Sequence, residues 1–121
     1  HTWDVWAVAT VQEETSFLGA YTSAFDIRPQ IAIAVDGTFA KGPGSNGWQT
    51  HPMGKGGGLC MGPNIHPFLH KKLTELADKL EIPWFLHVTY AHSGTDAYPM
   101  QVSAEGVPTA LVEFLASKKF I

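Results

Sequence analysis

The hydrophobic pattern of the chain predicts four strands, the first two of them buried. The segments Trp3–Val11 and Ile31–Val35 are apolar at consecutive positions, which is typical of strands covered on both faces. Trp84–Tyr90 and Pro108–Phe114 are interpreted as the third and fourth strands. We expect Trp3–Val11 to be a central strand. We expect Ile31–Val35 to stop at Asp36-Gly37, because glycine frees the backbone for a turn.

Helical spacing is clearest in the segment that begins at Pro67. Proline suits the first helical turn, and apolar residues recur at helical spacing as far as Leu80, while the opposite face is charged. Shorter helices are expected over Thr15–Phe25 and Asp96–Ala104. The segment Lys41–Gly58 is rich in Gly, Pro, Ser and Asn, so it is predicted to form a long loop.

Strands that alternate with helices predict an α/β fold, a layered sheet with helices on its faces. A chain of 121 residues has room for one core, so residues 1–121 are expected to form one domain or part of one. In such sheets the crevice beyond the carboxyl ends of the strands collects functional residues. Glu13, Glu14 and Asp36 follow two of the predicted strands and are therefore candidates.

Composition and charge exclude several classes of protein. With 45% hydrophobic and 16% charged residues the chain is globular rather than disordered. Its net charge is -3 and its basic residues are scattered, so nucleic acid is not expected as a partner. No apolar run approaches a membrane-spanning helix of ~20 residues, and no export leader precedes the first predicted strand. The single cysteine, Cys60, cannot form an internal disulfide, which favours a reducing, cytoplasmic setting.

Acidic side chains are the strongest candidates for chemistry. Glu13 and Glu14 are adjacent, so one could bind a metal while the other acts as general base on a metal-bound water. The alternative is a solvated turn. Asp36 could bind a metal or accept hydrogen bonds from the turn that follows it. Asp96, in the loop after the third predicted strand, could be a helix N-cap or contact a substrate.

The glycines and histidines carry weaker signals. Gly56 to Gly58 lack the lysine and the helix start that a phosphate-binding loop needs, so a flexible or tightly turning loop is the better interpretation. His66 and His70 are four residues apart, but the glutamate of a His-Glu-x-x-His zinc site is absent, which favours capping or surface roles. The other candidate ligands, with no diagnostic spacing, are His51, His87 and His92.

The order of short motifs along the chain is informative in itself. In chain order the motifs are Val8-Ala9-Thr10-Val11-Gln12-Glu13-Glu14, Gly19-Ala20, Thr22-Ser23-Ala24, Ile33-Ala34-Val35-Asp36-Gly37-Thr38, Met53-Gly54-Lys55-Gly56, His66-Pro67, Ile82-Pro83, Gly94-Thr95-Asp96-Ala97 and Gly106-Val107-Pro108-Thr109. This series resembles the tetrahedral, glutamyl-aminopeptidase-like family of metallo-aminopeptidases. The resemblance runs from about Val5 to Val112, which is nearly the whole chain.

The resemblance implies a cytoplasmic exopeptidase that hydrolyses N-terminal residues from peptides and uses two divalent metal ions, commonly zinc or cobalt. Its fold would be a mixed sheet with helices on both faces, like the catalytic core of zinc-dependent exopeptidases, and homo-oligomeric shells are common in the family. By position, Glu13 resembles the general base, Glu14 a ligand of one metal and Asp36 a ligand of the other. The positions Gly94, Thr95 and Asp96 match a substrate-binding loop.

The chain also departs from the family pattern. Relatives take a histidine, a metal-bridging aspartate and a small β domain from segments upstream of the first predicted strand. They take another histidine from an Arg-Tyr-x-His stretch after the last strand, where this chain has none between Glu113 and Lys119. We therefore expect a piece of a larger peptidase or a truncated gene product that binds metal weakly and turns over little substrate. The alternatives are a non-catalytic self-associating α/β module and, because some relatives carry an endoglucanase label, a carbohydrate hydrolase.

Overall fold

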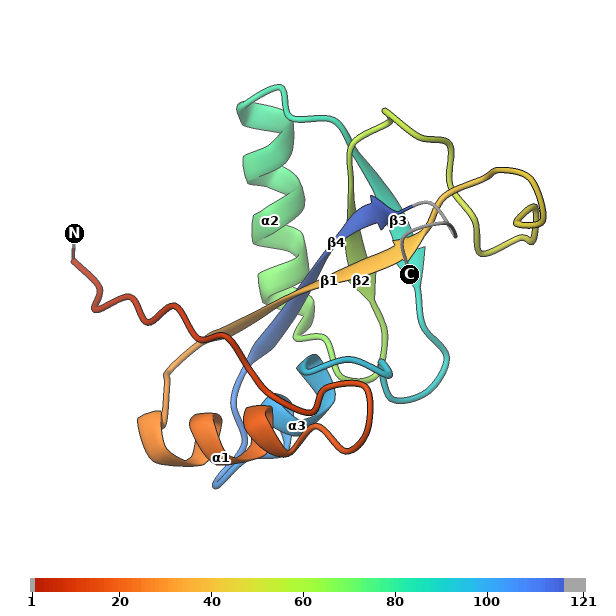
Figure 1. Ribbon diagram of the computed structural model, residues 1–121. Coiled ribbons are helices and arrows are strands. Elements are labelled where there is room, and N and C mark those ends of the chain that lie inside the picture. Colours follow the sequence, from red (N-terminus) through yellow and green to blue (C-terminus); the bar gives the residue numbers. More distant parts are fainter. Residues whose placement is uncertain (1, 117–121) are drawn as a thin grey trace.

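A four-stranded mixed sheet forms the centre of the computed structural model, which describes residues 2–116 (Figure 1). The strands are β1 (Ala32–Phe39), β2 (Gly57–Met61), β3 (Trp84–Val88) and β4 (Thr109–Ala116), and their order in the sheet is β1-β4-β2-β3. β1 pairs with β4 in parallel, and β2 pairs with β3 in parallel. An antiparallel contact between β2 and β4 joins the two pairs. The predicted α/β class with a mixed sheet is confirmed.

Three helices accompany this sheet: α1 (Leu18–Ile27), α2 (Pro67–Lys79) and α3 (Ala97–Gln101). α2 packs against β2 and β4, whereas α3 packs against β1 and β4 and also contacts α1. Figure 1 shows α2 on one side of the β1 and β4 ribbons and the α1–α3 pair on the other. Within residues 2–116 no helix is long and apolar enough to cross a membrane.

The core lies between α3 and the sheet. It consists of the buried residues Ala34, Cys60, Ile65, Ala97 and Leu111, with Met100 packed against them. Small side chains on both β1 and α3 let the helix approach the sheet closely. Because side chains alternate along a strand, Ala32 and Ala34 are buried while Ile33 and Val35 on the opposite face of β1 are 53% and 70% exposed.

The prediction that Trp3–Val11 forms a central strand is wrong. This segment has no regular secondary structure, and its large apolar side chains are exposed, with Val5 at 81% and Trp6 at 70%. A strand needs a neighbouring strand to satisfy its backbone hydrogen bonds. None of the strands in the described part of the chain pairs with this segment. β-branched and aromatic residues favour a strand conformation, but a strand forms only where another strand is available to pair with it.

Two further boundaries differ from the sequence expectation. β1 does not stop at Asp36-Gly37 but continues to Phe39, because β4 pairs with it along its whole length. β2 begins inside the segment that was predicted to be a loop, and its first two residues are Gly57 and Gly58. The three predicted helices and the two later strands are confirmed, with ends shifted by a few residues.

Candidate active site

One cavity of about 870 Å³ collects five of the six predicted site residues. The five are Glu13, Glu14, Asp36, Gly94 and Thr95. They come from three separate parts of the chain: the turn before α1, strand β1, and the loop between β3 and α3. The cavity also reaches the last residues of β1 and β4, so it lies at the carboxyl ends of this parallel pair.

Glu13 and Glu14 lie in a tight turn rather than at a strand end. Gln12 begins this turn with a φ of 61°, and its carbonyl oxygen accepts hydrogen bonds from the amides of the three residues 15–17. The turn is closed by Gly19, whose amide donates to the carbonyl oxygen of Val11 at 3.1 Å. A Cβ on Gly19 would come within 2.5 Å of the Val11 backbone, so only glycine allows this approach. The closed turn leaves Glu13 half-buried and Glu14 exposed, with both lining the cavity.

Asp36 lies within β1, and its carboxylate oxygen Oδ1 accepts a hydrogen bond of 2.6 Å from the Gly37 amide. It shares the face of β1 that carries Ala32 and Ala34, which is the face that α3 covers. Burial raises the pKa of Asp36, and the nearby carboxylates Glu113, Asp96 and Glu14 raise it further, against the opposing effect of the Gly37 amide. The predicted hydrogen bond from the following backbone to the Asp36 side chain is present, although Asp36 lies inside a strand and not in a turn.

Negative charge accumulates around this cavity. Burial raises the pKa of Glu13, and the carboxylates of Asp36, Glu14 and Asp96 add to the effect. Within residues 2–116 no lysine, arginine or histidine forms an ion pair with Glu13, Glu14 or Asp36. Such a set of oxygen donors fits a divalent cation chemically, since a cation would relieve the mutual repulsion. Their oxygens do not, however, form a group of three within 4.8 Å of one another.

Side-chain hydrogen bonds of Thr95 and Asp96 hold the loop before α3 in place. Thr95 is buried, and its hydroxyl accepts a hydrogen bond from the Ala97 amide at 3.1 Å, so it caps α3. Asp96 occupies the N-cap position but makes no side-chain cap hydrogen bond. Its Oδ2 instead accepts a hydrogen bond from the Thr10 hydroxyl at 2.5 Å, and its Oδ1 is buried without a partner. Asp96 does not line the cavity.

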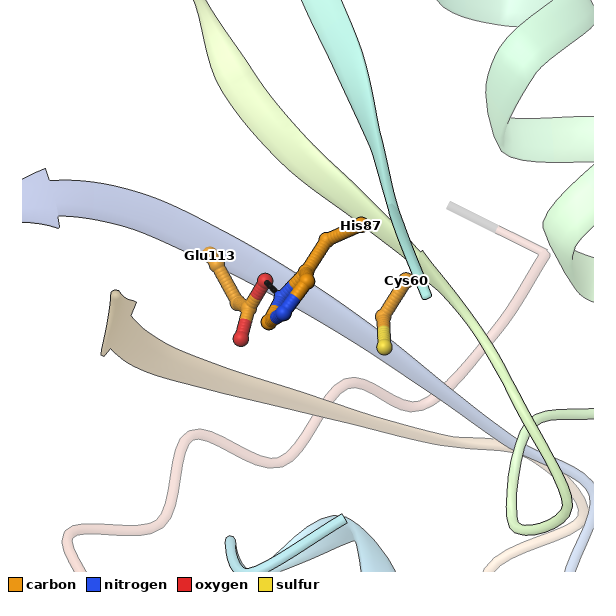
Figure 2. A group of neighbouring side chains, drawn as sticks. All are labelled: Cys60, His87 and Glu113. Atoms are coloured by element: carbon orange, nitrogen blue, oxygen red, sulfur yellow. Dashed lines mark hydrogen bonds and ion pairs between the residues drawn. The ribbon is translucent and has the colours of Figure 1, made fainter. Parts of the chain in front are cut away.

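Three residues that the sequence did not single out as a group lie beside this cavity. The side chains of Cys60, His87 and Glu113 converge from β2, β3 and β4, and their ligand atoms all lie within 4.8 Å of one another (Figure 2). The Nδ1 atom of His87 pairs with Oε2 of Glu113. This pairing raises the pKa of His87 despite the opposing effect of burial. Burial, with the charge of Glu113, raises the pKa of the Cys60 thiol to about 11.

The sequence could not reveal this group, because β2 was not predicted as a strand and its pairing with β4 joins residues more than fifty positions apart. The other histidines have different surroundings. His66 is exposed at the N-cap of α2 without a side-chain cap hydrogen bond, and Nδ1 of His70 lies 3.0 Å from the Cys60 carbonyl oxygen. The predicted position of the missing downstream histidine falls partly on residues 117–119, which lie outside the described residues.

Comparison with known proteins gives a consistent answer. Residues 1–118 match the sequence profile of M42 glutamyl aminopeptidase. The chain is 43% identical over 112 residues to the lysyl aminopeptidase of Pyrococcus furiosus, covering 93% of this chain and 32% of that protein. An aminopeptidase from the archaeon Desulfurococcus kamchatkensis has a similar structure, with a TM-score of 0.79, 33% identity, and coverage of 91% of this chain and 33% of its own.

A further similar structure is the TET1 peptidase of Pyrococcus horikoshii, which assembles into a tetrahedron or a large octahedral shell. Its TM-score is 0.67 at 27% identity, with coverage of 90% of this chain and 32% of its own. This chain therefore spans about a third of the length of the relatives it matches. Because the family profile covers nearly every residue and the sheet and helices match those of aminopeptidase structures, the chain belongs to the M42 glutamyl aminopeptidase family.

Proposed function

We propose that residues 1–121 are the central part of the catalytic domain of a two-metal aminopeptidase, which removes N-terminal residues from peptides. The observation that carries the proposal is the cavity that Glu13, Glu14 and Asp36 line together, without a cationic partner in the described part of the chain. Membership of an aminopeptidase family supports it independently.

Glu13 is the general base in this proposal. Its pKa is raised first by burial and then by neighbouring carboxylates, so its carboxylate accepts a proton more readily than an isolated one. The short turn from Gln12 fixes the backbone at Glu13, because three successive amides bind one carbonyl oxygen. A catalytic base needs such a fixed position, since proton transfer requires the donor and acceptor to be within hydrogen-bond reach.

Glu14 and Asp36 would each hold one divalent ion, zinc or cobalt. When bound, these ions polarise the substrate carbonyl and activate water. The Gly37 amide fixes one oxygen of Asp36 and leaves the other oxygen for a cation. Gly94 and Thr95 line the same cavity and would contact the peptide, whereas Asp96 supports the loop through Thr10.

The two proposed ligands are too few to hold two ions against water, because each ion needs several protein ligands. The matched relatives are about three times as long as this chain, so further ligands have a source in a longer protein. We therefore propose that residues 1–121 alone bind metal weakly at Glu14 and Asp36 and hydrolyse peptides slowly.

Activity of this chain and of a longer polypeptide that contains it tests the proposal. Hydrolysis of aminoacyl reporter substrates would be measured after metal removal by a chelator and after addition of zinc or cobalt. In the longer protein we expect Glu13→Gln to lower kcat by about 10²–10⁴-fold with unchanged metal content. Asp36→Asn should lower the metal content itself. Glu105→Gln is the matched control, because Glu105 is exposed and pairs only weakly with Arg28.

Two results would contradict the peptidase proposal: a longer protein without metal-dependent hydrolysis, or a Glu13→Gln variant as active as the parent. A carbohydrate hydrolase, suggested by the endoglucanase label of some relatives, would be favoured only if the same preparation cleaved a β-glucan. A cytoplasmic setting for the peptidase is also proposed, and the buried free thiol of Cys60 is compatible with it.

Self-association is the second candidate function. Ile33 and Val35 form an exposed apolar face on β1, and β1 is an edge strand of the sheet. Apolar patches and free strand edges promote association. We propose a homo-oligomer, in line with the shells that the Pyrococcus horikoshii relative forms. Sedimentation would show association that Val35→Lys weakens, whereas a monomer at all concentrations would exclude it.

A further inference from the structure

Cys60, His87 and Glu113 are brought together by strand register. Cys60 lies directly opposite His87 in the β2–β3 pair, and Glu113 lies opposite Gly58 in the β2–β4 pair. Because side chains alternate along a strand, Gly58 and Cys60 share one face of β2. All three side chains therefore project from the same face of three neighbouring strands, and Figure 2 shows His87 and Glu113 directed toward each other with Cys60 beside them.

Gly58 provides the space that this arrangement needs. A Cβ at this position would lie 3.0 Å from Oε2 of Glu113 and 3.1 Å from the Phe85 ring. Such contacts are tighter than nearly all real Cβ contacts, so a larger residue would displace the Glu113 carboxylate. The glycine thus allows a carboxylate to lie over the middle of the sheet, next to the imidazole of His87.

The group is buried, and its polar atoms are only partly satisfied. Cys60 is 1% exposed and Glu113 is 4% exposed. Glu113 forms an ion pair with His87, and no lysine or arginine pairs with it within residues 2–116. The Cys60 thiol lies 4.0 Å from the Met61 carbonyl oxygen, the outer limit for a sulfur hydrogen bond, and its other hydrogen-bonding neighbour is the Thr89 side chain. Within residues 2–116 only the His87 imidazole offsets the cost of burying this carboxylate, and a bound cation would offset it further.

A second observation points to a missing group at this place. His51 lies beside His87 with a ring centroid separation of 5.8 Å, and its ring stacks on Phe85 at 3.9 Å. Its Nε2 atom is buried and has no hydrogen-bond partner. A buried ring nitrogen without a partner calls for an explanation, and a nearby ion or its bound water would supply one.

We propose that Cys60, His87 and Glu113 bind one divalent metal ion of the zinc class. This ligand set differs from the Glu14 and Asp36 pair, although Asp36 lies opposite Glu113 in the β1–β4 pair. Thiolate, imidazole and carboxylate are the three ligand types that zinc takes in proteins. Tetrahedral coordination at ordinary bond lengths separates sulfur and nitrogen ligands by roughly 3.5 Å. The three atoms already lie within 4.8 Å of one another, so the shell closes with small side-chain movements.

Coordination changes the protonation of the site in a defined way. The Cys60 thiol and the His87 imidazolium of the ion pair each release one proton to solvent, so the ion is bound by a thiolate and a neutral imidazole. The ion then carries one thiolate and one carboxylate, so the buried site has no net charge. His87 and Glu113 line the large cavity, which gives the fourth coordination position access to water. This inference does not depend on the peptidase proposal.

Cobalt substitution tests the site on the 121-residue chain. A thiolate bound to Co²⁺ produces a ligand-to-metal charge-transfer band in the near ultraviolet, and Cys60 is the single cysteine of the chain. Titration of metal-free protein should produce this band and saturate at about one equivalent. Cobalt binding without the band would overturn the proposal, because the metal would then avoid Cys60.

Substitutions identify the other two ligands. His87→Ala and Glu113→Gln should each weaken cobalt binding by more than the ~10-fold that loss of an outer-shell partner costs. His66→Ala, which removes an exposed histidine, should leave the band unchanged. Wild-type cobalt affinity in both His87→Ala and Glu113→Gln would overturn the assignment. If these variants do not fold, X-ray absorption of the zinc-loaded parent decides, since a shell without one sulfur ligand excludes the site.

Discussion

Gly19 lies in α1 and contacts the backbone of Val11, next to the turn that contains Glu13. Gly19→Ala tests whether this close contact stabilises the fold. The new Cβ would lie 2.5 Å from the backbone nitrogen and oxygen of Val11, whereas ordinary contacts begin at 3.4 Å, so the two segments must separate by about 0.9 Å. The hydrogen bond from the Gly19 amide to Val11, now 3.1 Å, would lengthen beyond a useful distance.

The free energy of unfolding should fall in this variant. Overpacking costs about 1–3 kcal/mol, and loss of the hydrogen bond costs about 1 kcal/mol. The higher helix propensity of alanine stabilises the folded state by at most about 1 kcal/mol, and by less at the start of a helix. We therefore expect a net loss of about 1–4 kcal/mol. In a longer, active protein kcat should also fall, because Glu13 lies within the displaced turn.

Urea unfolding followed by tryptophan fluorescence measures this loss. Gly47→Ala is the control, since a Cβ there meets nothing within 4 Å, and its stability should stay within about 0.5 kcal/mol of the parent. A Gly19→Ala chain as stable as the parent, or more stable through helix propensity, would refute the close approach between Val11 and α1.

Three further predictions concern the core and the charged groups of the metal-free chain. Leu111→Ala should cost about 2–5 kcal/mol in urea unfolding, because Leu111 is 1% exposed at the centre of the core; a cost below 1 kcal/mol would contradict that packing. Glu113 raises the pKa of His87, so their pair stabilises the fold fully below the unfolded value of about 6.5 and loses its effect as pH rises through the higher folded value. Stability of chelator-treated protein should therefore fall with pH over this range, and His87→Gln should flatten the profile. Burial raises the pKa of Asp36 from 3.8, so its ionised form destabilises the metal-free fold at neutral pH. Asp36→Asn should raise the melting temperature of the metal-free chain at pH 7 and weaken metal binding. A lower melting temperature would contradict the raised pKa of the Asp36 carboxylate.

Part of the candidate site could be anticipated from residue order. The motifs around Glu13, Asp36 and Thr95 identify the family, and the structure places all three on one cavity. Their separation along the chain hides this proximity, which arises because β1 and the loop after β3 meet at the carboxyl end of the β1–β4 pair. The hydrogen bond from Thr10 to Asp96 could not be anticipated, since it joins residues 86 positions apart.

The sequence by itself determined the local elements and the family. Helical spacing after Pro67 and apolar runs at residues 84–90 and 108–114 are local signals, and they correspond to α2, β3 and β4. Strand pairing was decided only in three dimensions. Trp3–Val11 has strand composition but no partner among the described strands, whereas Gly57 and Gly58 have little strand propensity and still form β2 between two neighbours. The physical reason is that a sheet is stabilised by hydrogen bonds to strands distant in sequence, which the pattern of any one segment does not contain.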